Sequence, residues 1–412
     1  MKYGLIGEHL GHSYSCEIHG AIADYEYELK ELAPDELDGF MRAKEFNAIN
    51  VTIPYKQAVI PYLDEISDRA RRIGAVNTVV NRGGRLYGDN TDFAGMSALA
   101  KRMKIDFRGR KVLILGTGGT SKTAHAVADS LGAKEIFNVS RHGGADGLIS
   151  YADAVQKHND AQIIINTTPV GMYPNSERTP IDISAFGALE GVLDAIYHPL
   201  RTNLVLDALE RGIPASGGLY MLSAQAVYAS AVFLGKEVEP ELIEKAYNIV
   251  KSDKQNIVLV GMPSSGKTTV GRIIAERTGK SFADTDDIIV NEIGMPIAQY
   301  FAERGETAFR DLESRTLADA SQKGGCVIAT GGGAVLRPEN VRVMRRNGTV
   351  VFIDRAIEKL IATDDRPLSS NRAALERLYA ERYNIYKAAA DLHIDGNGTP
   401  EEVAQAVLKE LK

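Results

Sequence analysis

Residues 256–268 read NIVLVGMPSSGKT, in which an apolar run typical of a buried strand leads into a match to the pattern G-x-x-x-x-G-K-[ST]. In that pattern, glycines let backbone N–H groups curl around phosphates, and the following helix N-terminus adds partial positive charge. Lys267 can reach the β and γ phosphates, and the Thr268 hydroxyl can bind Mg²⁺. The stretch therefore predicts a nucleoside triphosphate site, here assigned to ATP with Mg²⁺. Its expected contacts are Gly261, Ser264, Ser265, Gly266, Lys267, Thr268 and Thr269.

Strand-like and helix-like segments alternate along most of the chain, as they do around this loop. The stretches 123–131 and 268–278 are helix-like. Alternation of this kind predicts an α/β fold with parallel sheets. The β-branched runs that we expect to form strands lie at residues 111–115, 161–166, 256–260, 326–330 and 349–353.

A short polar stretch, residues 251–255, precedes the strand that carries the loop. Residues 241–250, just before it, place apolar side chains near helical spacing. A new apolar strand then starts at residue 256. We therefore expect residues 1–250 and 256–412 to fold as separate units joined by a linker at 251–255.

The composition is that of an ordinary globular protein. Of 412 residues, 44% are hydrophobic and 25% are charged, so two or three domains with sizeable cores are expected. A net charge of −6 argues against a nucleic-acid partner, which requires a basic excess. Cys16 and Cys326 form neither a metal-ligand spacing nor a disulfide framework. Without a signal pattern or a membrane-spanning apolar run, we expect a cytoplasmic monomer or homodimer with no membrane partner.

Acidic, basic and glycine residues downstream of the loop suit a hydroxylated, anionic acceptor. Asp284 and Asp286 follow a strand-like run, and alternation along an extended chain places both carboxylates on one face. One can hold Mg²⁺ through water while the other contacts a substrate hydroxyl. The glycines at 331–333 let backbone approach a ligand closely. Taken singly, an arginine is more often a solvated surface residue, but three are candidate anion contacts: Arg310, Arg366 and Arg382.

Over residues 256–412 the chain resembles shikimate kinase. The resemblance rests on motifs that occur in order: the P-loop, DTD at 284–286, GETAFR at 305–310, GGG at 331–333, RPL at 366–368, and Arg382 four residues before Tyr386. It implies that Asp286 contacts the shikimate hydroxyls and acts near the 3-hydroxyl. It also implies that Arg310 and Arg382 bind the shikimate carboxylate, with Gly332 and Gly333 nearby.

Around the phosphates, the resemblance implies roles in charge stabilisation. Lys267 neutralises developing charge, and Arg366 closes over the phosphates from a lid. Thr268 and Asp284 serve Mg²⁺. The chain departs from the family pattern at residues 364–365, where two aspartates just before Arg366 weaken the attraction of the lid to ATP.

A second phosphate-binding pattern lies in the N-terminal half. Residues 111–115, KVLIL, form a buried-strand pattern that runs into GTGGTS at 116–121 and then a helix from about residue 122. This is the context of a dinucleotide-binding loop, although Ser121 stands at the third glycine of G-x-G-x-x-G. The next expected strand ends in an arginine, Arg141, where an NAD site needs an acid. A guanidinium suits the 2′-phosphate, so NADP is favoured over NAD.

Four polar clusters upstream of this loop each end an apolar run, and together they suit a small polyhydroxylated acid. They are GHSYS at 11–15, NVTIPYK at 50–56, GAVNT at 74–78 and GDNTD at 88–92. Any single one is explained equally well as an unrelated turn. Their combination resembles shikimate dehydrogenase over residues 1–250. Further matching stretches are NTTPVGM at 166–172, DAIY at 194–197 and residues 218–226.

The resemblance implies reduction of 3-dehydroshikimate to shikimate by NADPH, with Lys56 and Asp92 as the catalytic pair. An alkoxide that forms beside an ammonium group is stabilised and then protonated, and Asp92 keeps Lys56 oriented and charged. The implied substrate contacts are Ser13, Ser15, Thr52, Asn77, Asp92, Tyr197 and Gln225. The implied cofactor contacts are Gly116, Thr117, Gly118, Gly119, Arg141, Gly218, and, at the nicotinamide, Thr167 and Met221.

The two resemblances name consecutive steps, so a bifunctional enzyme is the preferred hypothesis. The resemblances imply that residues 1–94 with 219–250 form the substrate lobe and residues 95–218 a Rossmann lobe for NADP. They imply that residues 256–412 form a five-stranded parallel P-loop kinase. The loop after Arg141 lacks the second arginine often found in the family, which weakens the expected NADP selectivity. Two alternatives stay open: a dehydrogenase of related specificity, such as for quinate or aminoshikimate, paired with the same kinase, or one half that has decayed to a ligand-binding module.

Overall fold

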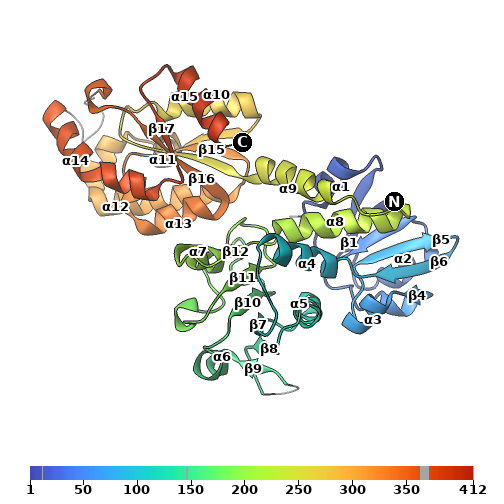
Figure 1. Ribbon diagram of the computed structural model, residues 1–412. Coiled ribbons are helices and arrows are strands. Elements are labelled where there is room, and N and C mark those ends of the chain that lie inside the picture. The colour runs from blue at the N-terminus through green and yellow to red at the C-terminus, as the bar shows by residue number, and fades with distance from the viewer. Residues whose placement is uncertain (12, 145–146, 362–370, 412) are drawn as a thin grey trace. The chain divides into compact units, whose positions relative to one another are not determined.

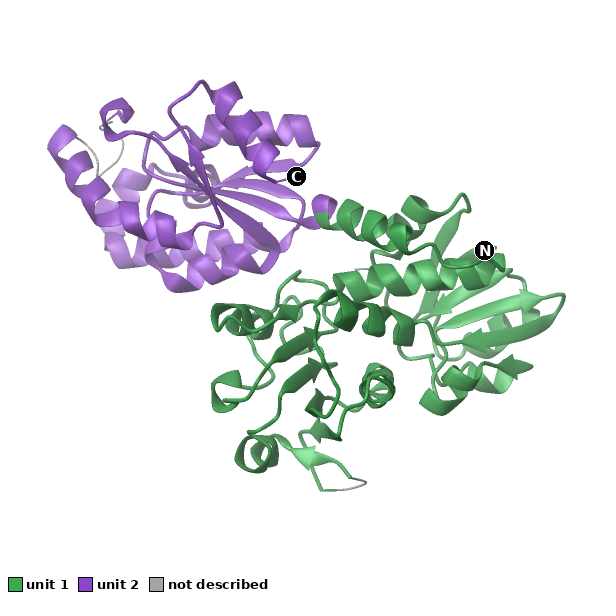
Figure 2. Cartoon of the chain, in the orientation of Figure 1, with its two compact units in different colours: residues 1–251 green, residues 252–412 purple. Residues whose placement is uncertain are grey.

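The computed structural model describes residues 1–11, 13–144, 147–361 and 371–411. The chain divides into two compact units, Met1–Lys251 and Ser252–Lys412 (Figure 2). The division between the units falls within the expected linker at 251–255, but most of this stretch is helical: α9 (Pro240–Lys254) continues through it and only Gln255 precedes the next strand. The polar side chains there form the solvated last turn of a helix, which composition alone does not distinguish from a linker. Within the described ranges, no helix is long and apolar enough to cross a membrane.

The first sheet of the N-terminal unit is mixed, with strand order β2-β1-β3-β5-β6-β4. Strands β1 and β3 are parallel, while β5 pairs antiparallel with both β3 and β6, so β1, β3 and β6 all end at one edge. The strands are β1 (Tyr3–Gly7), β2 (Tyr27–Glu31), β3 (Ala48–Val51), β4 (Glu65–Ile66), β5 (Thr78–Arg82) and β6 (Arg85–Asp89). The helices are α1 (Ser15–Ile22), α2 (Leu37–Ala43), η1 (Ile60–Tyr62) and α3 (Asp68–Ile73).

The second sheet of this unit is parallel throughout, with order β12-β11-β10-β7-β8-β9 (Figure 1). The nearly continuous apolar runs of β7 and β10 are typical of strands covered on both faces. The strands are β7 (Lys111–Leu115), β8 (Glu135–Ser140), β9 (Ile149–Ser150), β10 (Ile163–Asn166), β11 (Gly191–Asp194) and β12 (Ala215–Ser216). The helices are α5 (Gly119–Ser130), α6 (Tyr151–Lys157), η2 (Ile183–Ala185) and α7 (Asn203–Glu210).

Helices α4 (Asp92–Arg102) and α8 (Leu219–Leu234) pack side by side and connect the two sheets. On one side, Met96 of α4 and Val227 of α8 share a core with Ile114 of β7. On the other side, Phe233 of α8 packs against Ala48 of β3. Because α4 begins at the edge where β6 ends, this packing holds the two sheets around one site. The lobe boundary placed at residues 94–95 falls inside α4.

The C-terminal unit is built on one parallel sheet of order β14-β15-β13-β16-β17, as expected for the P-loop domain. Its strands are β13 (Asn256–Val260), β14 (Ser281–Asp284), β15 (Cys326–Ala329), β16 (Gly348–Asp354) and β17 (Leu392–Asp395). Its helices are α10 (Lys267–Thr278), α11 (Thr285–Ile293), α12 (Ile297–Gln322), η3 (Ala334–Leu336), α13 (Pro338–Asn347), η4 (Ile357–Lys359), α14 (Arg372–Ala389) and α15 (Pro400–Glu410). Helix α12 breaks at Gly305, whose φ of 81° and ψ of 170° suit glycine alone.

Candidate active sites

An ion pair marks the first candidate site, at the edge where β1, β3 and β6 end. Lys56 follows β3, Asp92 begins α4, and Lys56 Nζ donates to Asp92 Oδ2 at 2.5 Å. Their side chains are only 15% and 10% exposed. Partial burial reduces the solvent screening of the pair. The arrangement offers an oriented ammonium group to a ligand at this edge.

Buried amides join the same site from other elements. Asn77, just before β5, donates from Nδ2 to Gln225 Oε1 of α8 at 3.3 Å. Its Oδ1 accepts the Thr91 backbone N–H at 2.7 Å, next to Asp92. Thr91 and its neighbour Thr78 are fully buried members of this network; sequence reasoning placed both in polar clusters but gave neither a role of its own. Three segments distant in sequence are therefore fixed together behind the ion pair.

Hydroxyl groups at the start of α1 were also expected in the site. Ser13 Oγ donates to Ser15 Oγ at 3.0 Å, and the Ser15 backbone N–H donates to Ser13 Oγ. Thr52 follows β3 beside Gly7, where an added Cβ would lie 2.6 Å from the Thr52 methyl group. Tyr197 packs its ring 5.2 Å from the ring of Tyr14 in the loop before α1.

The glycine-rich loop after β7 borders the lysine of this ion pair. Gly116 has a φ of 117°, and a Cβ there would lie 2.7 Å from Thr167 Oγ1. Both the backbone conformation and the lack of space therefore require glycine at this position. A Cβ on Gly119 would lie 3.8 Å from Lys56 Cδ. Helix α5 begins at Gly119, earlier than the expected start near 122, because Gly118 adopts the extended N-cap conformation. Thr117 and Gly118 are exposed to solvent.

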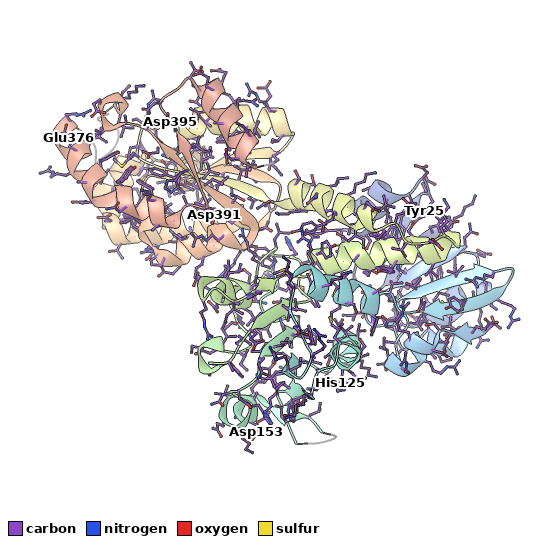
Figure 3. All side chains as sticks on the ribbon, in the orientation of Figure 1. Tyr25, His125, Asp153, Glu376, Asp391 and Asp395 are labelled. Atoms are coloured by element: carbon purple, nitrogen blue, oxygen red, sulfur yellow. The ribbon has the colours of Figure 1, made fainter. Side chains whose placement is uncertain are left out.

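Ser121, the departure from the glycine pattern, stabilises the loop. Its Oγ donates to the Gly116 carbonyl oxygen at 2.7 Å and accepts from Asn138 Nδ2 at 2.6 Å. His125, labelled on α5 in Figure 3, completes the chain through a 2.9 Å hydrogen bond between Nδ1 and Asn138 Oδ1. A side chain thus holds the backbone turn of the glycine-rich loop in place.

The other expected cofactor residues differ in their exposure and in what they contact. Arg141 is exposed directly after β8, the neighbour of β7, where a 2′-phosphate would lie. An added Cβ on Gly218 would meet the Ala195 carbonyl oxygen at 2.3 Å, so backbone packing alone requires this glycine. Met221 is only 7% exposed and packs in the core beside α4. The loop and Arg141 fit a phosphorylated dinucleotide, while the cofactor contacts of Gly218 and Met221 stay predictions.

The second candidate site is a cavity of about 700 Å³ beside the P-loop of the C-terminal unit. Lys267 lies in its wall, 8% exposed, and donates from Nζ to the carbonyl oxygens of Gly261 and Met262, each at 2.9 Å. Gly261 and Gly266 both have positive φ, and Gly266 is the N-cap of α10. Loop and helix N-terminus together fit the phosphates of ATP. The other loop residues named above lining this cavity are Ser264, Thr268 and Thr269.

A hydroxyl and a carboxylate form the candidate Mg²⁺ position. Thr268 Oγ1 donates to Asp284 Oδ2 at 2.6 Å. Asp284 ends β14 and its Oδ1 accepts the Asp286 backbone N–H, so it caps α11. The expectation that Asp284 and Asp286 alternate along a strand is therefore wrong, because Asp286 lies in the first helical turn, although both line the cavity. Oxygen ligands of this kind suit Mg²⁺, which takes its remaining ligands from phosphate and water.

Arg310 lies flat against the glycine triplet. A Cβ on Gly333 would fall within 2.5 Å of three guanidinium atoms of Arg310. Arg310 Nη1 donates to Glu313 Oε2 at 2.7 Å, and Glu306 accepts from its Nε and Nη2 at 3.3 Å. Glu313 is 1% exposed, and burial raises its pKa while Arg310 opposes the shift. Sequence reasoning missed Glu313, although its place three residues after Arg310 on a helix is a usable signal.

Two residues of α14 hold the middle glycine of the triplet. Arg382 Nη1 donates to the Gly332 carbonyl oxygen at 3.0 Å, and the Tyr386 hydroxyl donates to the same oxygen. Burial raises the pKa of Tyr386 to about 12, which keeps it a donor at neutral pH. Arg382 thereby reaches the cavity beside Arg310. The expected lid residue Arg366 lies outside the described residues.

Comparisons with known proteins find relatives for each of the two units. A family profile for shikimate kinase matches residues 263–412, and one for the shikimate dehydrogenase substrate binding domain matches residues 5–79. The NADP(+) shikimate dehydrogenase of Clostridium perfringens is 34% identical over 266 residues, covering 60% of this chain and 98% of that protein. The crystal structure of Thermus thermophilus shikimate 5-dehydrogenase in complex with NADP(H) and shikimate is similar at 27% identity, with a TM-score of 0.55 and coverage of 60% and 99%. Quinate dehydrogenase from Corynebacterium glutamicum, in complex with NAD, is similar at 26% identity, with a TM-score of 0.53 and coverage of 60% and 98%.

Proposed function

Since the chain belongs to the shikimate dehydrogenase family and carries a shikimate kinase domain in its second unit, we propose that it catalyses two consecutive steps of the shikimate pathway. The N-terminal unit reduces 3-dehydroshikimate with NADPH, and the C-terminal unit phosphorylates the shikimate produced. One observation supports the proposal most strongly: a single chain contains both sites. The Lys56–Asp92 pair lies beside a dinucleotide-type loop in the first unit. Lys267, Thr268 and Asp284 line a cavity in the second unit.

In the dehydrogenase, the residues of the chain manage the proton. NADPH, when bound, supplies the hydride to the ketone carbon. Lys56 stabilises the negative charge that develops on the ketone oxygen and donates a proton to it. Asp92 holds Lys56 in place through the 2.5 Å hydrogen bond. Asn77 and Gln225, already fixed to each other, bind hydroxyl groups of the substrate ring.

In the kinase, the residues supply position and charge. ATP, when bound with Mg²⁺, supplies the phosphoryl group. Thr268 and Asp284 hold the metal ion, and Lys267 stabilises charge on the phosphates. Asp286 accepts a hydrogen bond from the attacking hydroxyl. Away from the phosphates, Arg310 and Arg382 bind the substrate carboxylate, since both residues line the same cavity.

The Arg141→Ala variant tests the cofactor assignment. We expect the Michaelis constant for NADPH to rise about 10-fold, since a guanidinium–phosphate contact is lost. The constant for NADH should change little, because NADH lacks the 2′-phosphate. Steady-state rates with each cofactor measure the difference. Equal effects on both cofactors would remove Arg141 from the phosphate site.

The Gly333→Ala variant tests the acceptor site of the kinase. An added Cβ displaces the Arg310 guanidinium, so the Michaelis constant for shikimate should rise about 10-fold or more while that for ATP stays unchanged. The displaced group is the end of a flexible side chain, so the fold should survive. The dehydrogenase rate of the same chain is the control. An unchanged constant for shikimate would mean that Arg310 does not bind the acceptor.

Quinate is the second candidate substrate, favoured by the similarity to a quinate dehydrogenase. Oxidation of shikimate and of quinate by the purified chain with NADP⁺ discriminates between the two. We expect kcat/KM for shikimate to be higher by about 10-fold or more, because quinate adds a polar group that the site must accommodate. A preference for quinate would overturn the proposed reaction but leave the kinase assignment in place.

A further inference from the structure

Asp194 is a wholly buried carboxylate that the proposed mechanism does not use. It is the last residue of β11, and it lies directly opposite Asn166, the last residue of β10, in the parallel pair. Both residues therefore lie at the carboxyl edge of the second sheet of the N-terminal unit. In a parallel α/β sheet this edge is where ligands bind.

Three hydrogen-bond donors surround Asp194. Asn166 Nδ2 and the Ile196 backbone N–H both donate to Oδ1 at 3.0 Å, and Thr202 Oγ1 donates to Oδ2 at 2.6 Å. Among the described residues, no cation pairs with it. Burial raises the pKa of Asp194 to about 6, opposed by these hydrogen bonds, so at neutral pH the group is ionised. A buried charge held by three donors fixes their positions strongly.

The donors come from two places at the carboxyl edge: Asn166 ends β10, whereas Ile196 and Thr202 lie in the connection between β11 and α7. The Ile196 carbonyl oxygen accepts the Gly218 backbone N–H at 2.7 Å, which ties in the start of α8. Asn166 Oδ1 accepts from both the backbone N–H and the hydroxyl of Thr168, which ties in the turn after β10. Thr202 is the N-cap of α7. Asp194 thus joins the end of β10 to the β11–α7 connection directly, and it is linked to the start of α8 through Ile196.

The strand order places these segments on one side of the dinucleotide loop. The loop follows β7, and Arg141, the expected 2′-phosphate contact, follows β8 on one side of it. A dinucleotide whose pyrophosphate lies at that loop must extend its other half over β10 and β11. That half carries the nicotinamide, so the segments held by Asp194 form its side of the cleft.

We propose that Asp194 is a positioning residue that fixes the nicotinamide-side wall of the dehydrogenase cleft. The inference rests on the proposed dehydrogenase function. Asp194 touches neither cofactor nor substrate in this account, and it acts through Asn166, Ile196 and Thr202. Its removal should loosen the cofactor site without altering the Lys56–Asp92 pair.

The Asp194→Asn variant tests this role. The amide keeps the size of the side chain but replaces one of the two acceptor oxygens with an NH₂ donor. This NH₂ group faces groups that are themselves donors, so at least one of the hydrogen bonds that hold the wall is lost. We expect the Michaelis constant for NADPH to rise about 10-fold or more, while that for 3-dehydroshikimate changes little. Kinase activity of the same chain should equal that of the wild type. Equal constants for NADPH in variant and wild type, or a loss of kcat alone with both constants kept, would overturn the role.

A pair of Thr202 variants keeps the test decisive if Asp194→Asn does not fold. Thr202→Val removes the hydroxyl donor and should raise the NADPH constant, whereas Thr202→Ser keeps it and should restore the wild-type value. No difference between the two would overturn the role. A wild-type chain that does not oxidise NADPH with 3-dehydroshikimate would instead remove the proposed function itself, so the two failures are distinguishable.

Discussion

Replacing Lys56 with alanine should lower dehydrogenase turnover by roughly 100- to 10,000-fold while the Michaelis constant for 3-dehydroshikimate stays nearly unchanged. The ammonium group is held at 2.5 Å from Asp92 and lies beside the dinucleotide loop, where it can donate a proton as the hydride arrives. Asn77 and Gln225 still bind the substrate in the variant, because their mutual hydrogen bond does not involve Lys56. NADPH oxidation at saturating substrate measures the loss.

Two controls accompany the Lys56 variant. Lys101→Ala removes an exposed lysine from α4 of the same unit and should leave turnover unchanged. The rate of shikimate phosphorylation reports on the intact second unit in every sample. A Lys56→Ala chain that keeps more than about a tenth of wild-type turnover would exclude Lys56 as the proton donor.

Lys267→Ala should cost the kinase about 3–4 kcal/mol of transition-state stabilisation, by analogy with removing one preorganised charge donor, which corresponds to a rate loss of about 150- to 900-fold. The ammonium group is buried in the cavity wall and held by two loop carbonyl oxygens, so its position is fixed before nucleotide binds. No other part of the P-loop backbone replaces its full positive charge. ADP release at saturating shikimate and ATP measures the effect.

The matched control for this variant is Lys409→Ala, which removes an exposed lysine from α15 of the same unit. Its phosphorylation rate should equal that of the wild type, and dehydrogenase turnover should be unaffected in both variants. A Lys267→Ala chain that phosphorylates shikimate at nearly the wild-type rate would contradict the assignment of the catalytic loop.

Local sequence patterns predicted the fold well where apolar runs and glycines act locally. The strands expected at 111–115 and 256–260 are β7 and β13 with the same bounds. A short, unbroken apolar run that ends at a glycine-rich loop is typical of a buried strand, and the glycines mark where it ends. The errors lie at polar termini. Residues 251–254 are helical and α5 begins at Gly119, since side-chain type alone does not decide whether a polar turn continues a helix.

The site was predicted residue by residue, but its geometry was not. Motifs named Asn77 and Gln225 separately, yet only the order of strands and the packing of α8 bring them within 3.3 Å. Glu313 and Asp194 were missed as parts of the sites because their roles depend on burial beside particular partners, which spacing does not reveal. Asp286 lines the cavity together with Asp284, although the strand alternation that predicted their shared face is wrong.

A coupled assay on the purified full-length chain tests the central claim of two consecutive steps most directly. The chain is given 3-dehydroshikimate, NADPH, ATP and Mg²⁺, and NADPH oxidation and ADP release are followed together. We predict that both proceed and that ADP release requires NADPH, since the kinase can phosphorylate only the shikimate that the dehydrogenase makes. ADP release without NADPH, or NADPH oxidation without subsequent ADP release, would contradict the two-step account.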